Sequence, residues 1–598
     1  MKILSILCLL LVFGASSTEL DWWETSVIYQ VYPRSFKDSD GDGVGDINGI
    51  IAKLDYIKEL GVDAIWIQPV YRSPMVDMGY DPISMKEIDP LFGTMEDMKN
   101  LIQASHERKL KVVIDLVPNH VSDQSEWFKR SVNRDGPYTD YFIWHDGKRI
   151  NDSHRTEPNN WVGWFEKSAW KWNEKRQQYY YRLFKDEQPD LNIRNPAVQA
   201  ELEDVLRFWL DRGVDGFRVD AIPILFEAAH LQDEPVTNDV MGISNTYFKR
   251  IHIYTQHQPE NLDILHRWRQ ILDEYKLKDG ITRLLSVEDP LGPKTLIPYF
   301  GNETFLAAHI PFYFGLINFY YTMNATVLDS VIHDFVDDVP KNRLPNWLTD
   351  SHDRVRTSSR MGADAVDAFM MMNLILPGSA CVYYGSEIGL EDSMIRGDQK
   401  TDKASKALSF LRDRSRGPMP WDDTKNGGFT TNKTPWLPLS TKYWTTNVRS
   451  QLREANSHLK IFKRLMALRK TVAVKYGDLE THVVNTWTYL FTRKANNDTV
   501  AVVINLGSES EAICSEESNF GLPETMFVHT GSLNSGFKIG DEVRIISSKG
   551  HSCTELRPKA GLVLTTYPTS AAIVWSAASW LLFLAIGTLT LCQTRFYQ

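Results

Sequence analysis

The sequence has no excess of positive charge. Its 598 residues include 66 lysines and arginines against 76 aspartates and glutamates, so that the formal net charge is -10. Nucleic-acid phosphates are bound by a concentrated basic surface, and no such surface is evident here. Hydrophobic residues at 43% and charged residues at 24% are ordinary values for a globular protein. The composition therefore argues against a nucleic-acid partner and against a disordered chain.

Apolar targeting segments occur at both ends of the chain. Residues 1–17 run from a lysine through an apolar stretch to Ala-Ser-Ser, which predicts a cleaved signal peptide. Residues 571–592 are nearly uncharged, and the cluster of lysine or arginine that usually follows a membrane span is missing. Small residues precede the most apolar part, as a glycosylphosphatidylinositol (GPI) signal requires. We expect a GPI anchor on the outer face of the plasma membrane, with a single C-terminal membrane span as the alternative.

Only five cysteines are present. Cys8 and Cys592 lie in the segments that we expect to be removed, and Cys381 lies in an apolar run that predicts a buried thiol. Cys514 and Cys553 both lie near the C-terminus, where an oxidising compartment favours a disulfide between them. Glycosylation sequons begin at Asn151, Asn302, Asn324, Asn432 and Asn497.

Short apolar runs alternate with helical patterns over more than 400 residues. The strand-like runs are residues 26–32, 64–67, 112–116, 217–220, 284–288, 347–349 and 381–384. Alternating strands and helices imply parallel pairing, and this number of repeats favours a (β/α)8 TIM barrel in the α/β class over an open sheet.

Two polar stretches interrupt the alternation, and the C-terminal region changes to short β-branched runs. The expected parts are a signal peptide (1–17), a barrel in two pieces (18–120 and 196–475), a small domain inserted after the third strand (121–195), a second insertion after the eighth strand (about 386–450), a C-terminal all-β domain (476–567) and a hydrophobic tail (568–598).

Four strand-like runs end in carboxylates or histidine. They are residues 115–120 (DLVPNH), 216–220 (GFRVD), 285–288 (LSVE) and 351–353 (SHD). Catalytic groups of a (β/α)8 barrel collect at the strand ends. Taken singly, each segment also has a structural interpretation, such as a helix-capping aspartate or a buried ion pair. Their order and spacing together favour a catalytic site.

These segments resemble the signature regions of the α-amylase family of glycoside hydrolases (family thirteen). The similarity is greatest to its maltases and oligo-1,6-glucosidases, especially the membrane-anchored midgut maltases of insects. The marker Gln-Pro-Asp-Leu-Asn of that subgroup stands at 188–192. The resemblance covers nearly the whole mature chain and implies cleavage of α-glucosidic bonds.

The resemblance implies Asp220 as nucleophile, Glu288 as acid/base and Asp353 as a third carboxylate that steadies the distorted sugar. Cleavage with retention needs two carboxyl groups about 5–5.5 Å apart. Arg218 lies two residues before Asp220 and would project to the same side of the strand, where its charge would keep Asp220 ionised. Glu288 must be protonated to act as an acid, so we expect a raised pKa for this group.

Further positions match substrate contacts of the family. They are Asp77, Tyr80, His120, Phe184, Arg218, His352 and Arg416. By this resemblance Asp77 and the two histidines bind sugar hydroxyls, Tyr80 forms a stacking platform, and Arg416 blocks the far side of the pocket. A blind pocket implies release of one terminal glucose. Family members that favour α-1,6 bonds usually carry valine where Ala221 stands, so α-1,4 maltose-like substrates are expected, and sucrose is compatible with them.

The chain departs from the family pattern at three places. Ser351 replaces the usual asparagine before the His-Asp pair, and Asp289-Pro290 follows Glu288 where Ala-Tyr is frequent. The usual Arg-Thr-Pro-x-Gln-Trp becomes Arg-Gly-Pro-Met-Pro-Trp at 416–421. None of the three removes a catalytic carboxylate.

An acidic loop at residues 38–46 (DSDGDGVGD) predicts a metal site. Carboxylates at alternating positions, with glycines that permit a tight turn, suit Ca²⁺, although a solvated acidic turn is the alternative. The helix–loop–helix calcium motif would need glutamate where Gly49 stands. The resemblance implies a structural Ca²⁺ bound by Asp38, Asp40, Asp42 and Asp46 and by the carbonyl group of Val44.

Two non-enzymatic interpretations stay open. The heavy chains of amino-acid transporters share this fold, but they are anchored at the N-terminus and several lack the catalytic carboxylates. A surface-binding or receptor role is compatible with weak hydrolysis, since some mosquito relatives are bound by a bacterial larvicidal toxin. A homodimer also remains open.

Overall fold

The computed structural model describes residues 20–151, 154–165, 167–237, 247–402, 411–513, 520–545 and 553–568. The predicted signal peptide, nearly all of the hydrophobic tail and Cys514 lie outside these residues. Within them, no helix is both long enough and apolar enough to cross a membrane.

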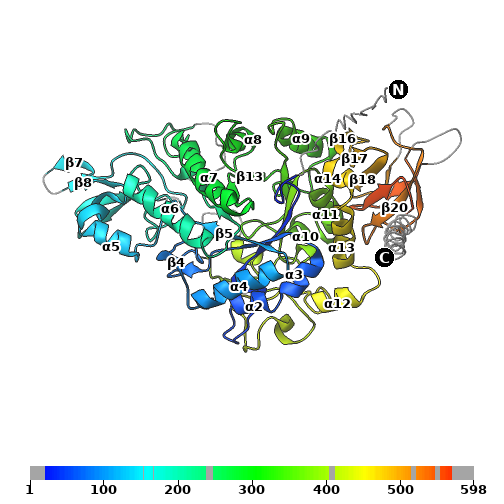
Figure 1. Ribbon diagram of the computed structural model, residues 1–598, viewed down its shortest axis with the longest axis horizontal. Coiled ribbons are helices and arrows are strands. Elements are labelled where there is room, and N and C mark those ends of the chain that lie inside the picture. Colours follow the sequence, from blue (N-terminus) through cyan, green and yellow to red (C-terminus); the bar gives the residue numbers. More distant parts are fainter. Residues whose placement is uncertain are drawn as a thin grey trace, which may run out of the picture.

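Eight parallel strands form the centre of the molecule (Figure 1). In chain order they are β1 (Val27–Val31), β2 (Ala64–Ile67), β5 (Lys111–Leu116), β11 (Gly216–Val219), β12 (Leu284–Glu288), β13 (Ile310–Phe312), β14 (Asn346–Leu348) and β15 (Ser379–Tyr383). Neighbours in the sheet are neighbours in the chain, and β1 pairs with β15. Asn346 links the remaining two edges, because its side chain accepts a hydrogen bond from the Tyr313 N–H, just beyond β13, at 2.9 Å. The predicted (β/α)8 barrel is confirmed.

Helices separate the strands along the chain. The main ones are α2 (Ile47–Ile51), α3 (Leu54–Leu60), α4 (Met95–Glu107), α6 (Pro196–Leu210), α7 (Glu260–Asp279), α9 (Ala325–Val336), α11 (Val366–Ile375) and α13 (His458–Leu468). The sequence marks their starts: Thr94 and Asp97 form a capping box at α4, and Asn195 caps α6 ahead of Pro196. Such starts fix where each strand-to-helix loop ends.

Alternation along the strands determines which side chains enter the barrel. Phe217 and Val219 pack in the cluster that the strands share with the helices. Successive strand residues point to opposite faces, so Arg218 projects into the barrel, where it is 2% exposed. By the same alternation, Glu288 points into the barrel, whereas Leu285 and Val287 point toward the helices. The buried, free Cys381 belongs to the inner cluster.

The inserted domain after the third barrel strand is built on a small antiparallel sheet. Its strands are β6 (Trp144–His145), β10 (Gln178–Tyr181) and β9 (Trp170–Asn173), accompanied by helix α5 (Glu126–Val132) and the hairpin β7 (Lys148–Asn151) with β8 (His154–Thr156). Trp161, Trp170 and Tyr181 form its aromatic core and extend to Ile224. The Trp-rich sequence therefore serves packing and places this domain beside the carboxyl end of β11.

The C-terminal region forms an antiparallel sheet, which confirms the predicted all-β domain. Its strand order is β16 (Asp478–Val483), β17 (Thr488–Ala495), β18 (Asp498–Asn505), β23 (Gly561–Thr565), β20 (Thr525–Gly531) and β21 (Glu542–Arg544). A Cβ atom at Gly561 would lie 3.1 Å from the Cα atom of Ala368 in α11. This close approach holds the sheet against the barrel helices, beside α13 (Figure 1).

Candidate active site

A cavity of about 200 Å³ opens at the carboxyl ends of the barrel strands. Seven predicted site residues line it: Asp77, Tyr80, His120, Phe184, Asp220, Glu288 and Asp353. They come from six separate segments of the chain. The parallel barrel brings these segments together at one end of the molecule, where its strands have their carboxyl ends. The remaining wall is largely apolar and includes Trp164, Phe165, Ala221, Ile224 and Leu291.

Arg218 connects the two carboxylates that are predicted to react. Its Nη1 lies 2.6 Å from Asp220 Oδ1, and its Nη2 contacts the carboxylate of Glu288. Because both carboxylates meet one rigid guanidinium group, they lie next to each other in one cavity. This is the close pairing that a retaining mechanism requires.

A third carboxylate, Asp115, lies behind this pair. Its Oδ1 is 2.9 Å from Arg218 Nη1, and its Oδ2 accepts a hydrogen bond from Trp66 Nε1 at 3.0 Å. Burial raises the pKa of Asp115 to about 7, against the opposing charge of Arg218. The carboxylates around it raise the pKa of Arg218 despite its burial, so that its charge is fixed. The positive charge of Arg218 thus lies among the carboxylates of Asp115, Asp220 and Glu288.

Asp353 is held by one histidine and two arginines. His352 Nε2 lies 3.0 Å from its Oδ2, and Arg416 Nη2 lies 2.6 Å from its Oδ1. Burial raises the pKa of Asp353, but these partners outweigh it and hold the pKa well below its usual range. Burial lowers the pKa of His352 to about 4. Asp353 is therefore a permanent negative charge at the cavity wall, as the stabilisation of a cationic sugar needs.

Arg412 is a cavity residue that the sequence reasoning did not assign. Its Nη2 lies 2.8 Å from Asp77 Oδ1, its Nη1 3.4 Å from Asp353 Oδ1 and its Nε 2.7 Å from Asp402 Oδ2. Arg416, which was predicted to block the pocket, is 1% exposed and does not line the cavity. It braces Asp353 from behind, whereas Arg412 and Arg354 line the cavity.

Asp77 and His120 are placed by contacts between the barrel and the inserted domain. Lys185 Nζ lies 3.1 Å from Asp77 Oδ1, and Gln188 Nε2 lies 3.0 Å from His120 Nε2. The pKa of Asp77 is lowered by Arg412 and Lys185 although burial opposes this. Gln188 is the first residue of the marker at 188–192, so this marker orients the residues predicted to bind sugar.

The aromatic residues of the site are already in contact with its histidines. Tyr80 stacks on His352 with ring centroids 5.5 Å apart and an angle of 7° between the planes. Phe184 meets His120 edge to face at 5.1 Å. The aromatic residues therefore also fix the orientation of the two histidine rings.

Ser351, one of the departures from the family pattern, has a local explanation. Its Oγ accepts a hydrogen bond from the Asp353 N–H at 3.2 Å. A short polar side chain that bonds the backbone two residues later is a common turn-forming device of serine and asparagine alike. Serine can thus replace asparagine without moving Asp353.

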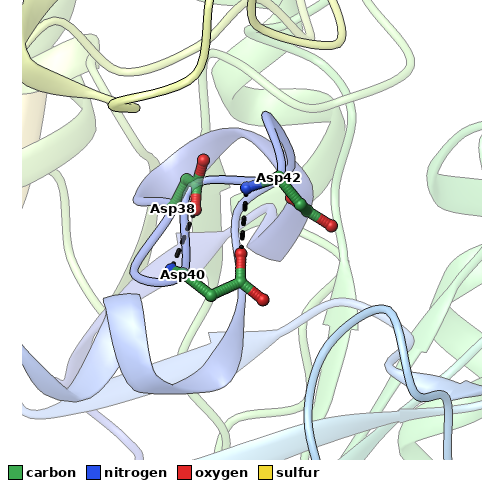
Figure 2. A group of neighbouring side chains, drawn as sticks. All are labelled: Asp38, Asp40 and Asp42. Carbon is green, nitrogen blue, oxygen red and sulfur yellow. Dashed lines mark hydrogen bonds between the residues drawn. The ribbon is translucent and has the colours of Figure 1, made fainter.

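The acidic loop brings three of its predicted ligands together (Figure 2). Oxygen atoms of Asp38, Asp40 and Asp42 lie within 4.8 Å of one another. Hard carboxylate oxygens at this spacing fit a calcium ion. Asp46 is placed differently: it caps α2 and accepts hydrogen bonds from Ser39 and from the Gly49 N–H.

The five sequons differ in their surroundings. Asn151, Asn302 and Asn497 are exposed, whereas Asn324 caps α9 and Asn432 donates from its Nδ2 to the Gly41 carbonyl group at 2.9 Å. Cys553 is disulfide-bonded. Its pairing with Cys514 and the use of each sequon stay predictions.

A (β/α)8 barrel with paired carboxylates on one arginine, at the carboxyl ends of its strands, defines the site of a glycoside hydrolase. The comparisons with known proteins identify the family. The model described as "Alpha amylase, catalytic domain" matches residues 30–477, and the chain belongs to this family.

Relatives and solved structures match nearly the whole chain. Maltase A1 of Drosophila melanogaster is 39% identical and spans 90% of this chain and 96% of its own length. Salivary alpha-glucosidase of Aedes aegypti is 40% identical and spans 86% of this chain and 90% of its own length. The crystal structure of the alpha-glucosyl transfer enzyme XgtA has a TM-score of 0.79 at 33% identity and covers 92% of this chain and all of that one.

Proposed function

We propose that the protein is a retaining, exo-acting α-glucosidase that releases terminal glucose from maltose-like α-1,4 oligosaccharides, with sucrose as a further substrate. The contact of Asp220 and Glu288 with the one guanidinium of Arg218 carries this proposal. The names of the relatives, a maltase and an α-glucosidase, support the substrate class.

The residues divide the reaction between them. Glu288 donates a proton to the glycosidic oxygen while Asp220 attacks the anomeric carbon and forms a covalent glucosyl–enzyme intermediate. Glu288 then takes a proton from water, which attacks the same carbon and releases glucose. Arg218 places its positive charge against Asp220, and Asp353 faces the positive charge that develops on the sugar ring.

The exo mode rests on the far wall of the cavity. Arg412 spans from Asp77 to Asp353 and Asp402, which closes the space behind a bound terminal glucose. The α-1,4 preference rests on Ala221, directly after the nucleophile, where a small side chain leaves room for a 4-linked neighbour. One side chain of this kind changes specificity by about 1–3 kcal/mol.

Glucose release from maltose, sucrose and isomaltose by the wild type and by Asp220→Asn tests the proposal. We expect the wild type to prefer maltose to isomaltose and the variant to lose on the order of 10⁴-fold in kcat. Asp398→Asn, in an exposed ion pair, is the matched control and should keep full activity. Full activity in Asp220→Asn would refute the assignment.

The non-enzymatic alternatives are disfavoured by the site. Asp220, Glu288 and Asp353 are all present and line one cavity, whereas a heavy-chain or receptor role needs none of them. Absence of glucose release by the wild type, with binding of the same sugars retained, would favour these alternatives.

A structural Ca²⁺ ion and an outer-surface location complete the proposal. Asp38, Asp40 and Asp42 would hold the ion, which would neutralise their charges and keep the loop folded. The N-terminal and C-terminal sequences support secretion and a GPI anchor. Release of the protein from intact cells by a phosphatidylinositol-specific phospholipase is expected for a lipid anchor and not for a membrane span.

A further inference from the structure

His257 connects the two segments that follow the reacting carboxylates. It lies in the loop between β11 and α7. Its backbone N–H donates to the Pro223 carbonyl group at 2.6 Å, three residues after Asp220. Its Nε2 lies 2.9 Å from Asp289 Oδ2, directly after Glu288. One residue thus bonds to both segments.

Both β-strands end shortly before the residues that His257 holds. β11 ends at Val219, and Ala221 has φ 56° and ψ 35°, in the left-handed region that alanine rarely adopts. β12 ends at Glu288 itself. Strand pairing fixes the backbone up to these ends, but the turns beyond them need other contacts to keep a single conformation.

Asp289 is built into its place. Its side chain is buried, its Oδ1 accepts the Leu291 N–H at 3.0 Å and its Oδ2 meets His257. Burial of a carboxylate costs free energy unless its oxygens accept hydrogen bonds. Asp289 therefore strongly favours the conformation in which its Oδ2 keeps the contact with His257 Nε2. Asp289 is also the first residue of the Asp-Pro pair at which the sequence departs from the family pattern, and the structure gives it a partner.

His257 itself has a strained backbone, with φ 51°. Such a conformation persists in a non-glycine residue only where the surroundings over-determine it. Here the bond to Pro223 and the bond to Asp289 both require it. The neighbouring Gln256 lines the cavity and donates to the Tyr247 hydroxyl at 2.6 Å, so the loop is held against the catalytic site.

We infer that His257 and Asp289 are positioning residues that set the distance and orientation of Glu288 relative to Asp220. They touch neither substrate nor reacting atoms, and they act by joining the turn after the nucleophile to the turn after the acid/base. This inference rests on the proposed function, because it assigns those two roles to Asp220 and Glu288.

The leaving group of the substrate separates positioning from folding. Maltose leaves a glucose hydroxyl, which must be protonated as the bond breaks, whereas 4-nitrophenyl α-glucoside has a leaving group that departs without a proton. A misplaced Glu288 therefore slows formation of the glucosyl–enzyme, the step that kcat/KM reports, much more for maltose than for the aryl glucoside. Hydrolysis of the glucosyl–enzyme, which also uses Glu288, is the same step for both substrates. Loss of folded protein lowers both rates equally.

The experiment compares kcat/KM for both substrates in His257→Ala, His257→Gln and Asp289→Ala with the wild type. Displacing a catalytic group by about 1 Å costs on the order of 10²-fold, so we expect kcat/KM for maltose to fall about 10²-fold in His257→Ala, and kcat/KM for the aryl glucoside to fall less than about 5-fold. Glutamine places an amide near Nε2 and should restore most of the maltose rate. The variant that combines His257→Ala with Asp289→Ala should lose no more maltose activity than either single alanine variant, because all three lose the same His257–Asp289 contact.

His458→Ala is the matched control, because His458 also pairs with a buried carboxylate, that of Asp367 at 2.6 Å, among the barrel helices. It should lower stability and leave the ratio of the two rates unchanged. Equal losses on both substrates in His257→Ala, or additive losses in the double variant, would overturn the inference. A wild type inactive on both substrates would instead refute the proposed function.

Discussion

Two groups of acidic side chains in this protein are neutralised in different ways. In the cavity, Asp77, Asp220, Glu288 and Asp353 are contacted by Arg218, Arg412 and Arg416. In the loop at 38–46, the aspartates accept backbone N–H groups, such as Gly41 and Gly43 at Asp38 and Val44 at Asp42, and no arginine or lysine pairs with them among the described residues.

The difference matches the two tasks. An arginine supplies the opposite charge and, at Asp220, contacts Oδ1, which suits attack on the anomeric carbon by the other oxygen. Backbone N–H groups shape the acidic loop but add no net charge. Burial and the neighbouring aspartates raise the pKa of Asp42, whereas hydrogen bonds from Thr430, Gly41 and Gly43 lower the pKa of Asp38 although burial opposes this.

A third set of carboxyl groups has no arginine or lysine partner. Asp190 and Glu227 are buried, and within the described part of the chain neither is in an ion pair. Asp190 accepts hydrogen bonds from the Leu183 N–H at 3.2 Å and from Asn119 Nδ2 at 3.1 Å. Burial raises the pKa of Asp190 to about 8 and that of Glu227 well above its usual range. Here the charge is removed by a proton. Each mode predicts a different response to substitution.

The largest effect is expected for Arg412→Ala. Asp77, Asp353 and Asp402 would lose a shared partner in a buried site, where breaking one ion pair costs about 3–5 kcal/mol. We expect a destabilisation of this size in chemical denaturation and a fall in kcat/KM of on the order of 10²-fold or more. Assays on maltose and unfolding curves measure the two effects.

Arg396→Ala is the control for this substitution. Arg396 also pairs with an aspartate, Asp398, but both side chains are 69% exposed. Exposed pairs contribute about 0–1 kcal/mol, so activity and stability should hardly change. Similar losses in the two variants would mean that burial is not what makes the arginines of the cavity important.

The different positions of Arg412 and Arg416 also show which parts of the site can be predicted from the sequence and which cannot. Strand-like runs that alternate with helical patterns predict the barrel, and the carboxylates at the ends of these runs predict that Asp220 and Glu288 share one end of it. These patterns are local. Because all the strands of a parallel barrel have their carboxyl ends on the same side, the residues that follow them come together there. Both arginines stand in one short motif, 412–416, and nothing in its spacing says which of them reaches the cavity.

Contacts between segments that are distant in the sequence cannot be predicted from such local patterns. His257 and Asp289 are 32 residues apart, and each alone looks like an ordinary loop residue. The change from alanine to Asp289 is a visible signal, but its partner emerges only when the loop after β11 is folded over the end of β12. Long-range partners of this kind depend on the loop conformation, which sequence periodicity does not encode.

Removal of the metal should have a smaller effect, confined to stability. If the acidic loop binds Ca²⁺ and the ion is present at about 100 times its Kd, binding stabilises the fold by about 2.7 kcal/mol. A chelator should lower the melting temperature by a few degrees, added Ca²⁺ should restore it, and Asp40→Asn should remove the response. An unchanged melting temperature in the chelated wild type would argue for a solvated acidic turn.

The last effect is a pH dependence and concerns Asp190, which joins the inserted domain to the barrel. Its pKa rises on folding, from 3.8 to about 8, so the folded state binds the proton more tightly than the unfolded state. Stability from this group is therefore complete below pH 4 and is lost as the pH rises toward 8, by at most about 1.4 kcal/mol per pH unit. In Asp190→Asn the fall in melting temperature between pH 6 and pH 8 should be shallower than in the wild type. Asp398→Asn, at an exposed position, should keep the wild-type slope. If Asp190→Asn keeps it too, this pair is ionised across that range, and protonation is not a third way in which this protein neutralises buried carboxyl groups.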